Sequence, residues 1–448
     1  MITRWHVKNF KSILDQDLEL APLTIFCGVN SSGKSSFLQS IAMLAQNTRK
    51  SAPTFSLNGC FLNLGEFNHV YNQTCNIEKN VDSTIDIRAT IFQEESGISI
   101  FDLKYGFGIS NALLIGGGKK ARLKRGNIPE IISLSMENKQ NEADDNGIIV
   151  NLIDSDSRIN RRSNYLFPDM SNIHDVEFPE KIKKTRDDLY DFFHSKVKYL
   201  GPLRVEPKDG CIRLKFYMDV DAEGKNTAAV LDFMRGNIIK RYISPENLST
   251  VKENNDVYFY TALEKWMIYI IFNDNNRFDY HTKVLKSGKI RIMFYLDGGN
   301  FYLNQLGNGV GWVLPILVTC LSAEPGSTII IQEPEAHLHP KMQSRLADFF
   351  IAMSLSGRQC LIETHSEYLI EQLRYRIITM SDQIPLHEKI KLYFVNKHNG
   401  ISYFDDILIN EFADLSDWPE NFFDESHKVK LNIMNAVVQK EEKAGKND

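Results

Sequence analysis

A glycine-rich segment near the start of the chain has the residue types and spacing that bind a phosphate chain. Residues 28–36 read G-V-N-S-S-G-K-S-S, which matches the pattern G-x-x-x-x-G-K-S. The glycines permit a tight turn in which main-chain N–H groups and a helix N-terminus converge on phosphates. Lys34 adds a mobile positive charge for the β- and γ-phosphates, and the Ser35 hydroxyl is placed to bind magnesium. The expected phosphate contacts are Asn30, Ser31, Ser32, Gly33, Lys34, Ser35 and Ser36.

A second candidate lies far downstream, where residues 328–335 read T-I-I-I-Q-E-P-E. This is the pattern of a buried strand that ends in carboxylates. Phosphoryl transfer depends on positioning of the attacking water, so Glu333 is the candidate for polarising that water. The alternative is an exposed carboxylate at a strand end. The separation from the phosphate loop is far longer than one βαβ repeat needs, which predicts a large insertion between two halves of one site.

Two further segments are candidates for the same site. Residues 361–366 read L-I-E-T-H-S, which places His365 after another apolar strand, where it can contact a γ-phosphate beside Glu333. A lone histidine at a strand end is usually structural, but its order after the other two motifs favours the functional interpretation. Residues 306–311 read L-G-N-G-V-G before a helix, so Asn308 and Gly309 are candidates to present N–H groups to phosphate. By itself, such a segment is only a turn.

The elements that must position these residues alternate as they do in a parallel sheet. Strand patterns at 3–10 and 23–27 precede an amphipathic helix that starts at Ser35. After residue 306 the chain predicts an apolar helix, a strand at 328–331, a helix after Pro340, a strand at 359–363 and a strand near 391–395. This alternation predicts an α/β fold whose sheet is completed by the C-terminal part.

The middle of the chain mixes strand-rich and helical pieces. Helices are expected at 180–198 and 260–272, and a solvated loop is expected at 136–147. Neither helix continues into the heptads of a long coiled coil, so any helical arm is short. The expected parts are 1–80 (N-terminal part of the head), 81–300 (inserted mixed region), 301–400 (C-terminal part of the head) and 401–448 (C-terminal extension).

Composition narrows the class of protein further. Hydrophobic residues at 43% and charged residues at 24% are typical of a folded chain and exclude general disorder. The net charge of −5 excludes a uniformly basic surface for nucleic acid but allows a local basic patch. The six cysteines form no C-x-x-C pair, which excludes the usual zinc and dithiol spacings. No signal peptide is evident, and the apolar stretch 310–323 is too short to span a bilayer, so a cytoplasmic protein without a membrane partner is expected.

In their order, the phosphate loop, the Gly-rich turn, the run E-P-E-A-H-L-H-P and T-H-S resemble the heads of ABC-type ATPases related to the RecF, SMC and OLD (overcoming lysogenization defect) proteins. The resemblance implies an ABC-type P-loop head assembled from both ends of the chain, with ATP and Mg²⁺ as cofactors. Residues 307–311 would form the signature motif that closes on the ATP of a second subunit, in a head-to-head homodimer or higher oligomer. His365 would be the switch histidine, and Lys11 in the run N-F-K-S would lie beside the nucleotide.

Three other segments, 199–204, 224–228 and 417–425, are similar to bacterial ATPases related to the ATPase subunit of the Septu anti-phage system. Such proteins act beside a nuclease encoded by a neighbouring gene, so an effector nuclease is the implied partner. OLD proteins instead carry a fused Toprim nuclease, but the roughly 80 residues after His365 are too few for that domain. The D-x-D pairs at 154–156 and 219–221 are interpreted as turn carboxylates.

One position departs from the family pattern. Gln332 stands where the class usually has a magnesium-associated aspartate. An amide can orient a magnesium-bound water, but it supplies no negative charge, so we predict weak magnesium affinity or slow turnover. Exchange of Gln332 for aspartate should then tighten the magnesium dependence or change the hydrolysis rate.

Three functions are compatible with these residues. The first is an ATPase whose dimer opens and closes to sense nucleic acid or to control an effector, and the basic run at 119–125 is a candidate contact for DNA or RNA phosphates. That run is otherwise a solvated hairpin tip. The second is a nucleotide-gated scaffold that turns over little ATP. A DNA-repair ATPase resembling RecF is the third.

Overall fold

The computed structural model describes residues 1–49, 56–72, 84–94, 97–106, 130–139, 148–153, 180–205, 211–212, 219–252, 257–272, 278–296, 298–416, 429 and 432–437. The basic run at 119–125, the pair at 154–156 and the segment 417–425 lie outside these residues.

The central sheet joins segments from the whole length of the chain. Its strands are β3 (Leu23–Gly28), β8 (Val197–Leu200), β15 (Thr328–Gln332), β16 (Gln359–Glu363), β17 (Ile390–His398) and β18 (Ile401–Ile407). The order is β18-β17-β3-β16-β15-β8, and every neighbouring pair is parallel except the β17–β18 hairpin. The carboxyl ends of β3, β16 and β15 therefore meet at one edge of the sheet, which is where ligands bind in open α/β sheets.

A second, antiparallel sheet lies beside the first. Its order is β2-β1-β4-β5-β6-β7. The strands are β1 (Ile2–Phe10), β2 (Ile13–Glu19), β4 (Thr84–Gln93), β5 (Gly97–Gly106), β6 (Glu130–Lys139) and β7 (Ile148–Ile153). Smaller pairings involve β9 (Cys211–Ile212), β10 (Ile238–Ile239), β11 (Val257–Tyr258), β12 (Phe278–Val284), β13 (Lys289–Leu296) and β14 (Gly299–Tyr302).

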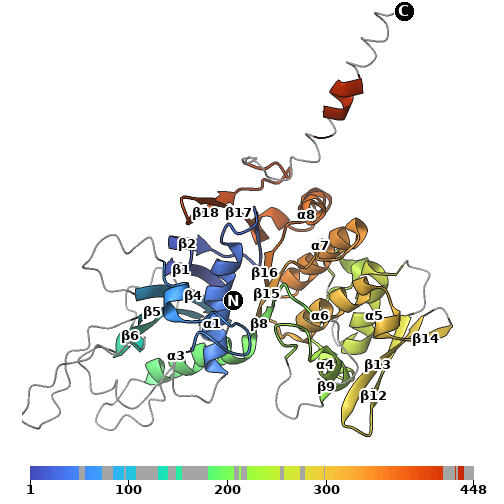
Figure 1. Cartoon of the computed structure of the whole chain (residues 1–448), viewed down its shortest axis with the longest axis horizontal. Coiled ribbons are helices and arrows are strands. Elements are labelled where there is room, and N and C mark those ends of the chain that lie inside the picture. The colour runs from blue at the N-terminus through green and yellow to red at the C-terminus, as the bar shows by residue number, and fades with distance from the viewer. Residues whose placement is uncertain are drawn as a thin grey trace, which may run out of the picture.

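The described helices are α1 (Lys34–Thr48), α2 (Phe67–Val70), α3 (Glu180–Asp191), α4 (Thr227–Met234), α5 (Phe259–Ile270), α6 (Asn308–Ser322), α7 (Pro340–Leu355) and α8 (Glu367–Thr379). Of these, α1 packs on one face of the central sheet, and α6 and α7 pack on the other (Figure 1). Alternate side chains of β15 enter different cores: Ile329 and Ile331 pack with the cluster of α4–α8, whereas Ile330 packs with α1 and the antiparallel sheet. Cover on both faces explains why the inner strands β3, β15 and β16 are largely apolar and almost entirely buried.

The predicted α/β fold, with its head assembled from both ends of the chain, is confirmed. Two local expectations were wrong. The loop expected at 136–147 begins inside β6, because residues 136–139 pair with β5. The helix expected at 180–198 ends as α3 at Asp191, followed by a π-helical turn at Phe192–Lys196 and then by β8. Pairing of β8 with β15 in the buried sheet overrides the local helical pattern.

Two further observations bear on the expected organisation. Strand β4, in the predicted insertion, pairs with β1, and β8 from the same region joins the central sheet. The four-part division of the chain stays a prediction. Across the described part of the chain, no helix combines the length and apolar character needed to cross a membrane.

Candidate nucleotide site

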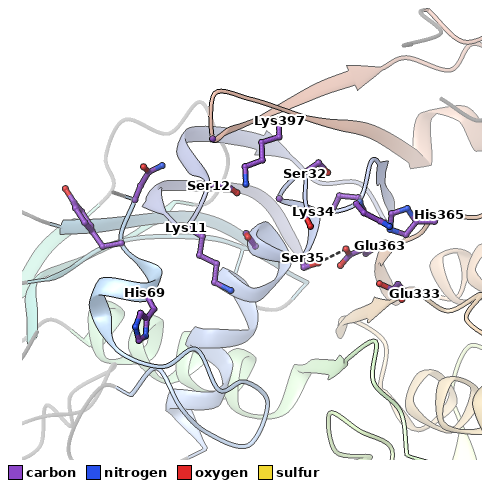
Figure 2. Close-up of a pocket in the computed structure, with 17 residues that line it drawn as sticks. Lys11, Ser12, Ser32, Lys34, Ser35, His69, Glu333, Glu363, His365 and Lys397 are labelled. Carbon is purple, nitrogen blue, oxygen red and sulfur yellow. Dashed lines mark hydrogen bonds between the residues drawn. The ribbon is translucent and has the colours of Figure 1, made fainter. Parts of the chain in front are cut away.

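A pocket of about 760 Å³ opens at the carboxyl edge of the central sheet (Figure 2). It brings together many residues that the sequence analysis selected: Lys11, Asn30, Ser31, Ser32, Gly33, Lys34, Ser35, Ser36, Glu333 and His365. It also contains residues that the analysis did not select: Ser12, His69, Tyr71, Asn72, Glu363, Lys397 and Gly400. Gln332 and Gly309 do not line it, and the side chain of Asn308 lies outside the described part of the structure.

The phosphate loop needs glycine at two positions because the C-terminal hairpin packs closely against it. Gly28 and Gly33 have φ angles of 130° and 115°, in the region that side chains disfavour. A Cβ on Gly28 would lie 2.3 Å from the main-chain oxygen of Val395, and one on Gly33 would lie 2.1 Å from Ser402 Oγ. Ser402 Oγ also donates to the carbonyl of Ser32 at 2.5 Å. The hairpin β17–β18 therefore holds the loop in shape.

Lys34 is buried inside this loop. Its Nζ donates to the carbonyl oxygens of Gly28 (3.0 Å) and Val29 (2.7 Å). Burial lowers the pKa of Lys34, and nearby carboxylates, Glu363 first, oppose that shift. The Ser32 hydroxyl is buried and has no hydrogen-bond partner among the described residues. A buried cation and an unpaired hydroxyl beside the N-terminus of α1 fit an anionic phosphate chain.

A chain of hydrogen bonds links the loop to the ends of β16 and β15. Ser35 Oγ donates to Glu363 Oε1 at 2.6 Å, and Gln332 Nε2 donates to Glu363 Oε2 at 2.5 Å. The Tyr199 hydroxyl in turn donates to Gln332 Oε1 at 2.5 Å. Burial raises the pKa of Glu363, although both donors favour its charged form. A role for Gln332 at magnesium stays a prediction, and its amide reaches the site only through Glu363.

Glu363 is the pocket residue that sequence reasoning missed most clearly. It occupies the last position of β16 and is 3% exposed, in register with Gln332 of β15. The run L-I-E-T-H-S had drawn attention to its histidine alone. The local signal was a glutamate at the end of an apolar strand, but its pairing with Gln332 follows only from the order of the strands.

Glu333 begins the turn after β15 and has a φ of 47°, an uncommon value for a residue with a side chain. Its N–H donates to the carbonyl of Glu363 at 2.8 Å. Arg204 donates to the carbonyl oxygens of both Gln332 and Glu333, the latter at 3.1 Å. Burial lowers the pKa of Arg204 to about 10, which still leaves it charged at neutral pH. These contacts fix the main chain on which the Glu333 carboxylate is carried into the pocket.

His365 lines the pocket from the segment that follows β16. Its N–H donates to Glu335 Oε1 at 2.5 Å. Burial, assisted by the charge of Lys34, lowers the pKa of His365 to about 4. A neutral imidazole of this kind can exchange one hydrogen bond with a phosphate oxygen.

Helix α6 begins at Asn308, and Gly309 in its first turn lies outside the pocket of its own chain. A Cβ on Gly309 would lie 3.1 Å from Met342 Cε of α7, so this turn is packed against a neighbouring helix.

The D-x-D pair at 219–221 also has a structural explanation. Asp219 makes ion pairs with Arg49 and Lys198, and Asp221 caps the following turn through the N–H groups of Glu223 and Lys225.

The fold and the pocket define a P-loop nucleotide-binding protein. The chain belongs to the AAA ATPase domain family, whose model matches residues 1–370. Residues 386–431 match a second family, described as protein of unknown function DUF3696. No curated protein matches the chain.

Two solved structures are similar to the chain. One is the SMC head bound to the C-winged helix domain of ScpA, with 11% identity and a TM-score of 0.48. The other is the SMC head domain from Thermotoga maritima, with 12% identity and a TM-score of 0.40. Each similarity covers 91% of this chain and 98% of the other.

Proposed function

We propose that this chain binds ATP with Mg²⁺ in the pocket and hydrolyses it, with Glu333 polarising the attacking water. The observation that carries the proposal is the convergence of the phosphate loop, Glu333 and His365 on one pocket from β3, β15 and β16. These are the parts that phosphoryl transfer needs: a phosphate cradle, a magnesium ligand and a group that orients water. The match to the AAA ATPase domain family supports the same chemistry.

Each side chain has a defined task in this proposal. Lys34 exchanges its two carbonyl acceptors in the loop for the β- and γ-phosphates, which are stronger, charged acceptors. Ser35 turns its hydroxyl to Mg²⁺, which supplies charge neutralisation for the phosphates when it is bound. Neutral His365 contacts the γ-phosphate. Lys11 and Lys397 add positive charge on other walls of the pocket (Figure 2).

Dimerisation is part of the proposed chemistry. Gly309, in the first turn of α6, does not line the pocket of its own chain. We therefore assign the N-terminus of α6 to the ATP of a second subunit, because helix N-termini favour negative charge. Two chains would then form a head-to-head homodimer, or a higher oligomer, with two shared ATP sites.

The biological role is proposed from the sequence resemblance. We propose that the ATP-driven change of the dimer regulates an effector nuclease encoded by a neighbouring gene, in anti-phage defence in the bacterial cytoplasm. Its test is to express the chain from its native operon and identify what co-purifies with it. A co-purifying nuclease supports defence, whereas recombination or repair proteins would favour the RecF-like alternative.

The enzymatic proposal is tested by measuring ATP turnover by the purified chain in Mg²⁺. Many ATP molecules should be hydrolysed per chain. Lys34→Ala should weaken ATP binding roughly 10- to 100-fold, because a hydrogen bond to a charged group is worth about 1.5–3 kcal/mol. Tight ATP binding with no more than a single turnover would instead support the nucleotide-gated scaffold, which Gln332 favours.

A further inference from the structure

The end of β15 lacks a carboxylate where a P-loop site needs one near magnesium. Gln332 there is 1% exposed, and its amide accepts from Tyr199 and donates to Glu363. A carboxylate is nevertheless present one strand away. Glu363 is paired with Gln332 in the parallel register of β15 and β16, so the two side chains lie side by side at the same sheet edge.

Glu363 is directed at the residue that binds magnesium in phosphate loops. Its Oε1 accepts from Ser35 Oγ at 2.6 Å, a contact between residues 328 positions apart in the chain (Figure 2). Two oxygens this close can serve a single cation. Its other oxygen is held by Gln332, so the carboxylate has little freedom to turn away.

The remaining surroundings also fit Mg²⁺. Among the described residues, no cluster of three or more His, Cys, Asp or Glu is placed to hold a metal by itself. Mg²⁺ does not need such a cluster, because it is usually bound by one or two carboxylates together with phosphate oxygens and waters. A buried carboxylate beside the Ser35 hydroxyl and next to a phosphate loop is the donor set that this arrangement requires.

We propose that Glu363 is the carboxylate of the magnesium site. At the end of β16, it has the role that an aspartate at position 332 would have at the end of β15. Gln332 is then a positioning residue that orients Glu363 through its amide N–H. This inference rests on the proposed function, since the cation arrives with ATP. The weak magnesium affinity predicted from Gln332 then no longer follows, because Glu363 on the neighbouring strand supplies the negative charge.

The test compares the affinity of ATP in Mg²⁺ with its affinity in EDTA, measured by isothermal titration calorimetry. Glu363→Gln should lower the affinity in Mg²⁺ roughly 10- to 100-fold, the usual cost of losing a partner at a metal site, and leave the affinity in EDTA unchanged. The double variant Gln332→Asp/Glu363→Gln returns a carboxylate to β15 and should recover most of the loss. Glu324→Gln, at an exposed carboxylate, is the matched control.

The outcomes separate the two proposals. Unchanged magnesium dependence in Glu363→Gln overturns the inference, as does an equal loss in Mg²⁺ and EDTA, which would indicate a structural role. If Glu363→Gln does not fold, the double variant is used in its place. ATP affinity that depends on Mg²⁺ in the double variant supports the inference, and a folded double variant whose ATP affinity does not depend on Mg²⁺ overturns it. A wild-type chain that binds no ATP in either condition overturns the proposed function as well. Electron paramagnetic resonance of Mn²⁺ with ATP should show the same losses directly.

Discussion

Arg204 donates a hydrogen bond to the main-chain carbonyl of Glu333 at 3.1 Å. The same guanidinium also bonds the carbonyl of Gln332, so it spans the peptide at which β15 ends. Glu333 has a positive φ there, a conformation that costs free energy and persists only when its surroundings enforce it. Arg204 is therefore a positioning residue for the carboxylate that we assign to water activation.

Arg204→Lys should lower kcat about tenfold and leave the Kd for ATP unchanged. Both bonds come from Nη2, which the planar guanidinium holds in a fixed orientation, whereas lysine keeps the charge on a flexible ammonium group. A tenfold fall in kcat corresponds to a rise of about 1.4 kcal/mol in the activation free energy. Steady-state kinetics and ATP titration would measure the two quantities. If Kd rises while kcat is unchanged, Arg204 serves binding instead of water activation.

A mixture of two inactive variants should recover activity if the ATP site is shared between subunits. Lys34→Ala disables the phosphate loop, and Asn308→Glu places a negative charge at the first turn of α6, where a helix tolerates an acidic residue. In an equimolar mixture half of the dimers are mixed, and each of those has one intact site of two. The expected turnover is about one quarter of the wild-type value.

Mass analysis of the mixture would show that mixed dimers form. Each variant alone is the control and should stay inactive. No recovery in a sample that contains mixed dimers would show that α6 does not complete the site of the partner subunit.

The packing of α7 against α8 depends on a buried ion pair. Asp348 is 0% exposed and accepts two hydrogen bonds from Arg376, with additional donors from Tyr269 and Gln372. Arg376→Ala should lower the free energy of unfolding by about 3 kcal/mol, because it leaves a buried charge without its counterion. Urea denaturation followed by circular dichroism would measure the change.

The exposed pair Arg4–Asp17 offers a matched control for that experiment. Asp17→Ala should change the free energy of unfolding by less than about 1 kcal/mol, since exposed pairs contribute little. Equal effects of the two substitutions would contradict the stabilising role assigned to the buried pair.

The local sequence was sufficient to predict the phosphate loop and the strands around it. The loop is defined by consecutive residues, and the strand expected at 359–363 coincides with β16. Glu363 and Arg204 could not be assigned in this way, because their roles depend on strand order. Only the order β3-β16-β15 brings Ser35, Glu363 and Gln332 together, and one sequence does not contain the pairing of strands.

The support that the hairpin β17–β18 gives to the phosphate loop could not be predicted for the same reason. Ser402 touches the phosphate loop across 370 positions of sequence, at Ser32. No local pattern connects these two serines. The structure also explains why the helix expected to reach residue 198 ends earlier, because residues 197–200 gain more from pairing with β15 than from another helical turn.

The most direct test of the central claim is the effect of Glu333→Gln on ATP turnover. The substitution keeps the shape of the side chain and removes the carboxylate that polarises water. We predict that kcat falls by about 10²- to 10⁴-fold, the usual contribution of a general base, while the Kd for ATP changes less than about twofold. Wild-type turnover in Glu333→Gln would contradict the account.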